Sequence, residues 1–369
     1  MHATTDDRKS YNRQKLWLSL LSGVLSFCVL IALFFSGLSD TLARWVMSQT
    51  ERPYLQFLLY LFALGLLQSI VTFPLSFYNG YILEHRYRLS NQSFKQWCFE
   101  NVKGLALGIV IGVPLLLIFF YTLRNFGFWW WLPLAGVLFL FSVLLARIAP
   151  TLIFPLFYTF KPVEKTALVE RITRLCLKAG LQVQGVFEFN LSKTTKKANA
   201  AFAGIGKSKR ILLGDTLLQQ FSDDEIEVVF AHEAGHYAHS HITKGMIWGI
   251  VSTFGGLCLT AFVYDNLFPA FEYTDRAELG ALPLIAILLS LYSVITTPAG
   301  HILSRRHERE ADAYALRETK NRAAFISAMQ RLSDTNLADE NPHPLVEWYF
   351  YSHPAIGKRI AAAETMILE

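Results

Sequence analysis

The sequence has few cysteines and little charge, and both shortages narrow the class of protein. The four cysteines lie far apart, so we expect neither a disulfide framework nor a cysteine-based zinc site. Only 17% of the 369 residues are charged, whereas a typical soluble domain has about 25%. Hydrophobic residues make up 53% of the chain. This composition predicts a membrane protein.

Six apolar runs are long enough to cross the hydrocarbon core of a bilayer, which takes about 20 residues. The first run follows a polar head and has no small-residue cleavage site behind it, so we interpret it as a retained anchor. The six predicted spans cover residues 16–35, 54–78, 105–123, 128–145, 246–263 and 282–303. We therefore divide the chain into a four-span membrane part (1–158), a soluble part (159–243), a two-span hairpin (244–303) and a second soluble part (304–369).

Lysine and arginine are unevenly distributed among the loops. They are concentrated after the second span and before the first, where Arg8, Lys9, Arg13 and Lys15 lie, and the other short links contain fewer of them. Because cytoplasmic loops carry the excess of basic residues, we expect both termini and both soluble parts on the cytoplasmic side. Topology then accounts for the net charge of +5, and we expect no nucleic-acid partner.

The first soluble part contains helical and extended patterns. Residues 162–179 have apolar side chains at helical spacing between Pro162 and Gly180, which predicts a helix. Residues 181–190 alternate and are rich in aromatic and β-branched side chains, which predicts a strand. Residues 199–214 predict a hairpin in a small sheet, with 199–203 as the outermost strand and the turn residues Gly204, Gly206, Lys207 and Ser208.

A metal-binding motif lies in the stretch AHEAGHYAHSH, residues 231–241. Ser222 and Glu225 form a capping box that opens a helix, and His232, Glu233 and His236 spell H-E-x-x-H on it. A four-residue separation puts both imidazoles on one helix face, where they can reach one zinc ion at roughly 2.0 to 2.1 Å. Glu233 is then placed to act as a general base on the water that zinc activates.

The motif supplies two ligands, and a third has to come from elsewhere. His239 shares the helix face, but seven residues of helix advance about 10.5 Å, so it cannot close on the same ion as His232. The position ten residues after His232 is Ile242, which cannot bind metal. We therefore interpret His239 and His241 as interfacial polar residues.

A better third ligand follows the sixth span, in the stretch RRHEREADA. The two-span hairpin returns this stretch to the side of the HExxH helix, so Glu308 can complete a His-His-Glu site with a fourth position open for water. Asp312, one turn further on, can accept the outward N–H of a ligand histidine. The alternative interpretation of this stretch is a solvated collar of charged residues, and we apply it to Arg305, Arg306 and Glu310.

These residues resemble the integral-membrane zinc metallopeptidases of the CAAX prenyl protease type, which are related to the bacterial heat-shock protease HtpX. The matching pieces are AHEAGH, RRHEREADAYA, NAAFAG followed by KRILLGDTLL, SHPAIGKRI, and YILEHRYRLSNQSFKQW. The resemblance runs from about residue 54 to the end. It implies a mainly α, polytopic membrane protein whose spans enclose a water-filled chamber, with a zincin-like α+β catalytic domain that holds one Zn²⁺.

The resemblance also implies roles for residues that spacing does not identify. Asn199, Ala200, Ala201 and Phe202 would belong to the edge strand on which a substrate peptide lies extended. His353 would stabilise the oxyanion of the tetrahedral intermediate and Arg359 would support it. From the residues alone, His353 before Pro354 is equally a helix-entry residue.

The chain departs from the eukaryotic prenyl proteases in having six predicted spans where they have seven, in being shorter, and in ending TMILE without a retention signal. These departures favour a prokaryotic relative in a bacterial inner membrane. They leave open whether the substrates are prenylated. We expect a zinc endopeptidase that acts on membrane-associated, lipidated or misfolded polypeptides. The alternatives are an HtpX-like quality-control protease and, from another class, a non-catalytic zinc-bearing transporter or chaperone.

Overall fold

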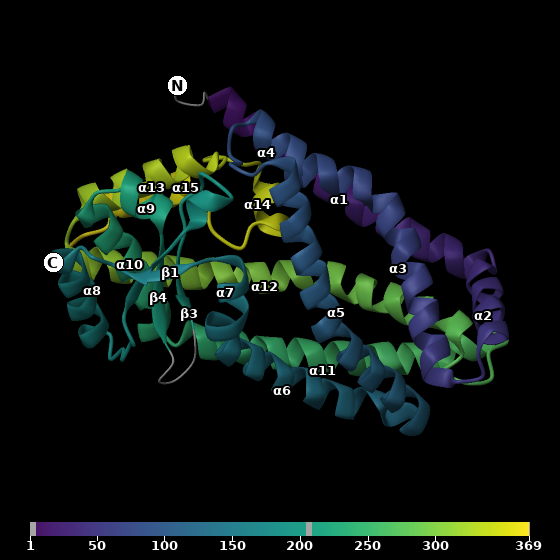
Figure 1. Ribbon diagram of the computed structural model, residues 1–369. Helices are drawn as coiled ribbons and strands as arrows, with labels where there is room; N and C mark the ends of the chain where they lie inside the picture. Colours follow the sequence, from purple (N-terminus) through teal and green to yellow (C-terminus); the bar gives the residue numbers. More distant parts are fainter. Residues whose placement is uncertain (1–4, 204–208, 369) are drawn as a thin grey trace.

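The computed structural model describes residues 5–203 and 209–368. Within these residues, six helices are long and apolar enough to cross a membrane, which confirms the six predicted spans. Figure 1 shows them extending away from the soluble part, with α11 and α12 side by side. The spanning helices are α1 (Thr5–Phe35), α3 (Pro53–Phe77), α5 (Phe94–Asn125), α6 (Trp131–Ile148), α11 (His241–Leu267) and α12 (Leu282–Thr319).

Polar contacts show which loops between the spans lie together at each end of the helix bundle. At one end, Lys15 pairs with Glu84 in α4 (Leu83–Arg86), and Asn91 donates to the carbonyl of Ser192 in the soluble part. At the other end, Ser39 in α2 (Leu38–Gln49) donates to the carbonyl of Gly280. The basic loops and the soluble segments therefore share one end of the helix bundle. This is the relative arrangement that six crossings require.

The spans pack against one another mainly at the end away from the soluble part. The rings of Phe57 and Phe120 stack there with centroids 4.2 Å apart, and Trp130 and Tyr264 are fully buried. Elsewhere the spans expose most of their apolar surface, as helices covered by lipid do. Spans that line a water-filled chamber would also expose apolar surface, so the predicted chamber stays a prediction.

The small sheet has four strands in the order β1-β2-β4-β3, with β3 at an edge as predicted. β2 pairs parallel to β4, and β3 pairs antiparallel to β4 with Ala201 opposite Leu212. The predicted turn residues Gly204, Gly206, Lys207 and Ser208 lie outside the described residues. The strands are β1 (Phe160–Pro162), β2 (Val186–Phe189), β3 (Ala200–Ala203) and β4 (Arg210–Gly214).

One prediction for this region is wrong in its detail. The predicted helix exists as α8 (Thr166–Lys178) and buries Leu168, Ile172 and Leu175. Pro162, however, lies in β1 and does not open the helix. β1 is an edge strand, a position that tolerates the missing N–H of proline.

The two soluble segments share one hydrophobic core, although a two-span hairpin separates them in the sequence. Ile172, Ile226 and Phe230 from the first segment pack with Phe325 and Ala363 from the second. This core joins α9 (Asp215–Gln220) and α10 (Asp223–Ala238) to α13 (Arg322–Asn336) and α15 (Ile356–Thr365). The remaining short helices are α7 (Phe154–Phe157) and α14 (Pro344–Phe350).

The predicted capping box at the start of α10 is present. The Ser222 hydroxyl accepts from the Glu225 N–H, and the Glu225 carboxylate accepts from the Ser222 N–H at 2.7 Å. α12 runs without a break through residue 303, where the second soluble part was expected to begin. A single continuous helix therefore connects the apolar span to the soluble core.

Candidate metal centre

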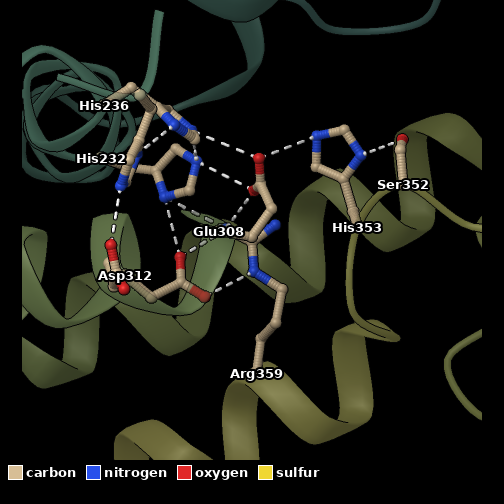
Figure 2. Close-up of polar contacts among 9 residues, drawn as sticks. His232, His236, Glu308, Asp312, Ser352, His353 and Arg359 are labelled. Carbon is tan, nitrogen blue, oxygen red and sulfur yellow. Dashed lines mark hydrogen bonds and ion pairs between the residues drawn. The ribbon is translucent and has the colours of Figure 1, made fainter. Parts of the chain in front are cut away.

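The three predicted ligands converge where α10 packs on α12. His232 and His236 extend from α10 toward Glu308 on α12 (Figure 2). The two Nε2 atoms are 3.2 Å apart, and each lies 3.2 Å from one oxygen of Glu308. The two-span hairpin therefore brings Glu308 back to the level of the two histidines, as predicted.

These distances fit a bound metal ion. Ligand atoms at roughly 2.0 to 2.1 Å on tetrahedral positions around zinc are about 3.3 Å apart, close to the spacings found here. Glu308 is 4% exposed, and its enclosed Oε2 atom lies 3.2 Å from His232 Nε2 without a well-aligned hydrogen bond among the described residues. A buried carboxylate oxygen without a hydrogen bond is costly unless a cation compensates it. The side chains present thus suit a divalent metal with nitrogen and oxygen ligands.

A carboxylate and an arginine hold His232 from behind. The Nδ1 atom of His232 lies 2.8 Å from Asp312, and Arg359 donates to both oxygens of Asp312 from Nε (2.8 Å) and Nη2 (2.5 Å). When Nδ1 carries the proton donated to Asp312, the lone pair on Nε2 faces the centre. Asp312 thus makes the predicted contact, and Arg359, for which the resemblance implied a supporting role, contacts Asp312.

Two carboxylates favour the protonated form of His232. Burial alone would lower the pKa of His232, but the adjacent carboxylates of Asp312 and Glu308 outweigh it and raise the pKa to about 9. A metal that binds at neutral pH must displace such a proton, because a histidine ligand has to be neutral at the ligating nitrogen.

Glu233 follows His232 on α10 and has a different environment. Burial raises the pKa of Glu233, and the adjacent His232 and His236 oppose this only in part. A carboxylate whose pKa is raised toward neutrality is a stronger base than an ordinary glutamate. The environment of Glu233 is therefore consistent with proton transfer.

His353 lies on the opposite side of Glu308 from the α10 histidines (Figure 2). Its Nε2 atom is 3.3 Å from Glu308 Oε1, and its Nδ1 atom is 2.9 Å from the Ser352 hydroxyl. The side chain is 61% exposed, so it is open to a bound molecule. α15 begins only at Ile356, so His353 lies before the first turn of that helix.

The predicted substrate strand borders α10. β3 packs against α10 and has β4 on one side only within the described sheet. Asn199 precedes β3, is exposed, and accepts the N–H of Gly214 at its carbonyl. Ala200, Ala201 and the backbone of Phe202 lie in β3. An edge of this kind can accept an added strand.

Two residues are buried, although we expected His241 at the membrane interface and Arg305 in a solvated collar. His241 is 5% exposed and lies 3.0 Å from the outward nitrogen of His236, with Glu310 on its other side. The prediction missed this contact because α10 ends at Ala238 and the chain turns at Ser240, a non-glycine residue with φ of 56°. A serine gives no clear signal for such a left-handed turn.

Arg305 is the second such residue. It is 8% exposed and donates to three backbone carbonyl groups, which belong to Glu347, Trp348 and Tyr351. These carbonyls lie at the end of α14, where the last carbonyls of a helix need partners from outside it, and that of Glu347 also accepts the Tyr351 N–H. Arg306, in contrast, is exposed as predicted, with its side chain 73% accessible.

A helical membrane part joined to an HExxH centre with a glutamate third ligand defines the class of membrane metallopeptidases. Residues 162–367 match the model of peptidase family M48, and residues 2–159 match the N-terminal region of CAAX prenyl proteases, described as five membrane helices. The chain belongs to peptidase family M48. It is a multi-pass integral membrane metalloendopeptidase.

Individual relatives cover most of the chain. It is 31% identical over 364 residues to the uncharacterized metalloprotease YhfN of Bacillus subtilis, covering 96% of this chain and 84% of the relative. It is 31% identical to CAAX prenyl protease 1 of Saccharomyces cerevisiae, covering 84% and 72%. The crystal structure of S. mikatae Ste24p matches with a TM-score of 0.87 at 27% identity, covering 98% and 89%. These matches favour an endopeptidase over a non-catalytic transporter or chaperone.

Proposed function

We propose that this chain holds one zinc ion on His232, His236 and Glu308 and uses it to hydrolyse peptide bonds in membrane-associated polypeptides. The observation that carries the proposal is the convergence of three ligand atoms at spacings of 3.2 Å beside a glutamate of raised pKa. Two nitrogen ligands with one carboxylate suit zinc, and a three-ligand set leaves a position open.

Zinc, when bound, supplies a Lewis acid that lowers the pKa of water toward 7. Glu233 takes a proton from the attacking water and later delivers it to the leaving amine. His353, whose exposed side chain has Nε2 3.3 Å from Glu308, donates a hydrogen bond to the oxyanion that develops on the substrate carbonyl. Asp312 and Arg359 hold His232 with its lone pair toward the metal.

The substrate lies as an added strand along β3, with its backbone paired to residues 199–202. Several relatives are named CAAX prenyl proteases, which supports polypeptides carrying a prenyl or other lipid anchor as substrates. Misfolded membrane proteins, as for an HtpX-like enzyme, are the second class to test. The basic end of the bundle, shared with the soluble part, supports a cytoplasmic active site, and the Bacillus relative supports a bacterial inner membrane.

The decisive experiment replaces Glu233 with glutamine in the purified full chain. Glu233→Gln keeps the size of the side chain and removes the base, so bound zinc should stay at one ion per chain. Cleavage should fall by about 10² to 10⁴, the usual contribution of a general base. Retained cleavage by this variant would contradict the mechanism.

Glu227→Gln is the matched control, because Glu227 lies on the same helix and pairs with Arg171 away from the centre. This control should cleave at the wild-type rate. Both variants are assayed on a farnesylated CAAX peptide and on an unfolded casein-like protein, each with and without chelator. Cleavage of the lipidated peptide alone supports a processing enzyme, whereas cleavage of casein alone supports quality control.

A further inference from the structure

His236 has a second histidine on the side that faces away from the centre. The Nδ1 atoms of His236 and His241 are 3.0 Å apart, and His241 Nε2 lies 2.9 Å from Glu310 Oε2. The chain reaches this position through the left-handed turn at Ser240, after which α11 begins at His241. Three side chains thus form a continuous line from Glu310 to His236.

The ring of His241 is held from several directions. The ring of His307 stacks on it with centroids 4.1 Å apart and planes 10° apart. Glu310 is itself fixed by Arg306, whose Nε donates to Glu310 Oε1 at 3.1 Å. His241 is 5% exposed, so water has little access to its polar atoms. Its contacts with His236 and Glu310 therefore have to satisfy its hydrogen-bonding groups.

Only one placement of protons fits these contacts and a metal on His236. A ligating Nε2 needs its lone pair, so the proton of neutral His236 is on Nδ1 and is donated outward. The Nδ1 of His241 must accept that proton, which places the proton of His241 on Nε2. The carboxylate of Glu310 accepts there. Each contact in the line thus fixes the tautomer of the next ring.

We propose that His241 is a positioning residue that holds His236 in its metal-binding tautomer, with Glu310 setting the tautomer of His241. The two histidine ligands are then supported differently. His232 donates directly to Asp312, whereas His236 reaches its carboxylate through a second imidazole. This inference rests on the proposed metal role of His236 and adds to it a residue outside the ligand set.

The test compares two substitutions of nearly the same shape. His241→Asn keeps an acceptor oxygen where Nδ1 lies, while His241→Leu fills the space without one. Zn²⁺ affinity is measured by competition with a chelating dye on the folded, full-length protein in detergent, and the visible spectrum of bound Co²⁺ reports ligand geometry. Partners of metal ligands contribute about 10- to 100-fold in affinity.

We expect His241→Leu to bind Zn²⁺ about 10- to 100-fold more weakly with an altered Co²⁺ spectrum, and His241→Asn to recover most of the affinity. Glu310→Gln should weaken binding by a smaller factor, because glutamine can stabilise either tautomer of His241. His239→Leu is the matched control, since His239 contacts His241 only through ring packing in the described structure, and it should bind as wild type does.

The outcomes separate this inference from the proposed function. Wild-type affinity and spectrum in His241→Leu would overturn the role of His241 while leaving the metal site intact. Equal losses in the leucine and asparagine variants would also overturn it, because packing and not an acceptor would then matter. His236→Ala should abolish binding at this site. If it binds Zn²⁺ normally, the proposed function itself fails, whatever the His241 variants do.

Discussion

Gly235 lies between the two functional turns of α10, and its missing side chain brings α10 and α12 into close contact. A methyl group built at this position would lie 3.0 Å from Ala311 Cα, 3.0 Å from Tyr314 Cβ and 3.1 Å from the Ala311 carbonyl oxygen. Carbon atoms in good contact are about 3.5 to 4.0 Å apart. Gly235→Ala must therefore separate the helices by roughly 0.5 Å.

Gly235→Ala should change the free energy of unfolding only a little, but it should disturb the geometry of the metal centre more. Overpacking of this kind costs about 1 to 3 kcal/mol, and replacing a helical glycine by alanine returns about 1 kcal/mol. The net loss of stability is therefore about 0 to 2 kcal/mol. The separation acts directly between His236 and Glu308, whose ligand atoms are 3.2 Å apart. A 1 Å error in a reacting geometry costs about 10²-fold, so roughly 0.5 Å should cost about 10-fold.

We expect Gly235→Ala to stay folded, to bind Zn²⁺ more weakly and to lose about 10-fold in peptide cleavage. Thermal unfolding, chelator competition and cleavage of a fluorogenic peptide measure the three quantities. Gly249→Ala in α11 is the control, because a methyl group there meets no atom within 4 Å. A Gly235→Ala protein with wild-type metal affinity would refute the idea that this contact sets the ligand spacing.

Three further predictions concern Asp312, the metal and Glu225. Asp312→Asn can donate to His232 Nδ1 and favour the wrong tautomer, so zinc affinity should fall about 10- to 100-fold; an unchanged value would remove Asp312 from this role. Treatment with a chelator should abolish cleavage and added zinc should restore it, whereas chelator-resistant cleavage would argue against metal catalysis. Burial alone would raise the pKa of Glu225, but hydrogen bonds from Ser327 and Ser222 and the ion pair with Arg331 lower it overall. The stabilisation from Glu225 is therefore present above its unfolded pKa of about 4.3 and is lost as the pH falls through the depressed value. Glu225→Gln should lower the melting temperature at pH 7 and make it less sensitive to acid; equal acid sensitivity in both proteins would contradict this.

Patterns that depend on near neighbours in the chain predicted much of this protein. Apolar runs identified the six spans, because spanning a bilayer requires a minimum length of apolar helix. Helical spacing identified the buried face of α8, and the pair Ser222 and Glu225 identified the start of α10. Pro162 shows the limit, since the same residue type can open a helix or end an edge strand.

The candidate site also shows which features local patterns predict and which they miss. The HExxH spacing and the return of the two-span hairpin were enough to select His232, His236 and Glu308, because helix periodicity and membrane crossing are regular geometries. Neither geometry predicts side-chain contacts across an irregular turn. His241 was therefore interpreted as a residue at the membrane interface and Arg305 as part of a solvated collar, although His241 contacts His236 and Arg305 contacts the end of α14.

By itself, the sequence determined six helices long and apolar enough to cross a membrane, and an HExxH motif on one helix. These properties depend on residue type and on spacing within single elements. Only the tertiary structure decided how close α10 and α12 come at Gly235, which carboxylate Arg359 holds, and which ring supports His236. Those choices depend on packing between elements distant in the chain and on one left-handed turn at Ser240, and periodicity carries no information about either.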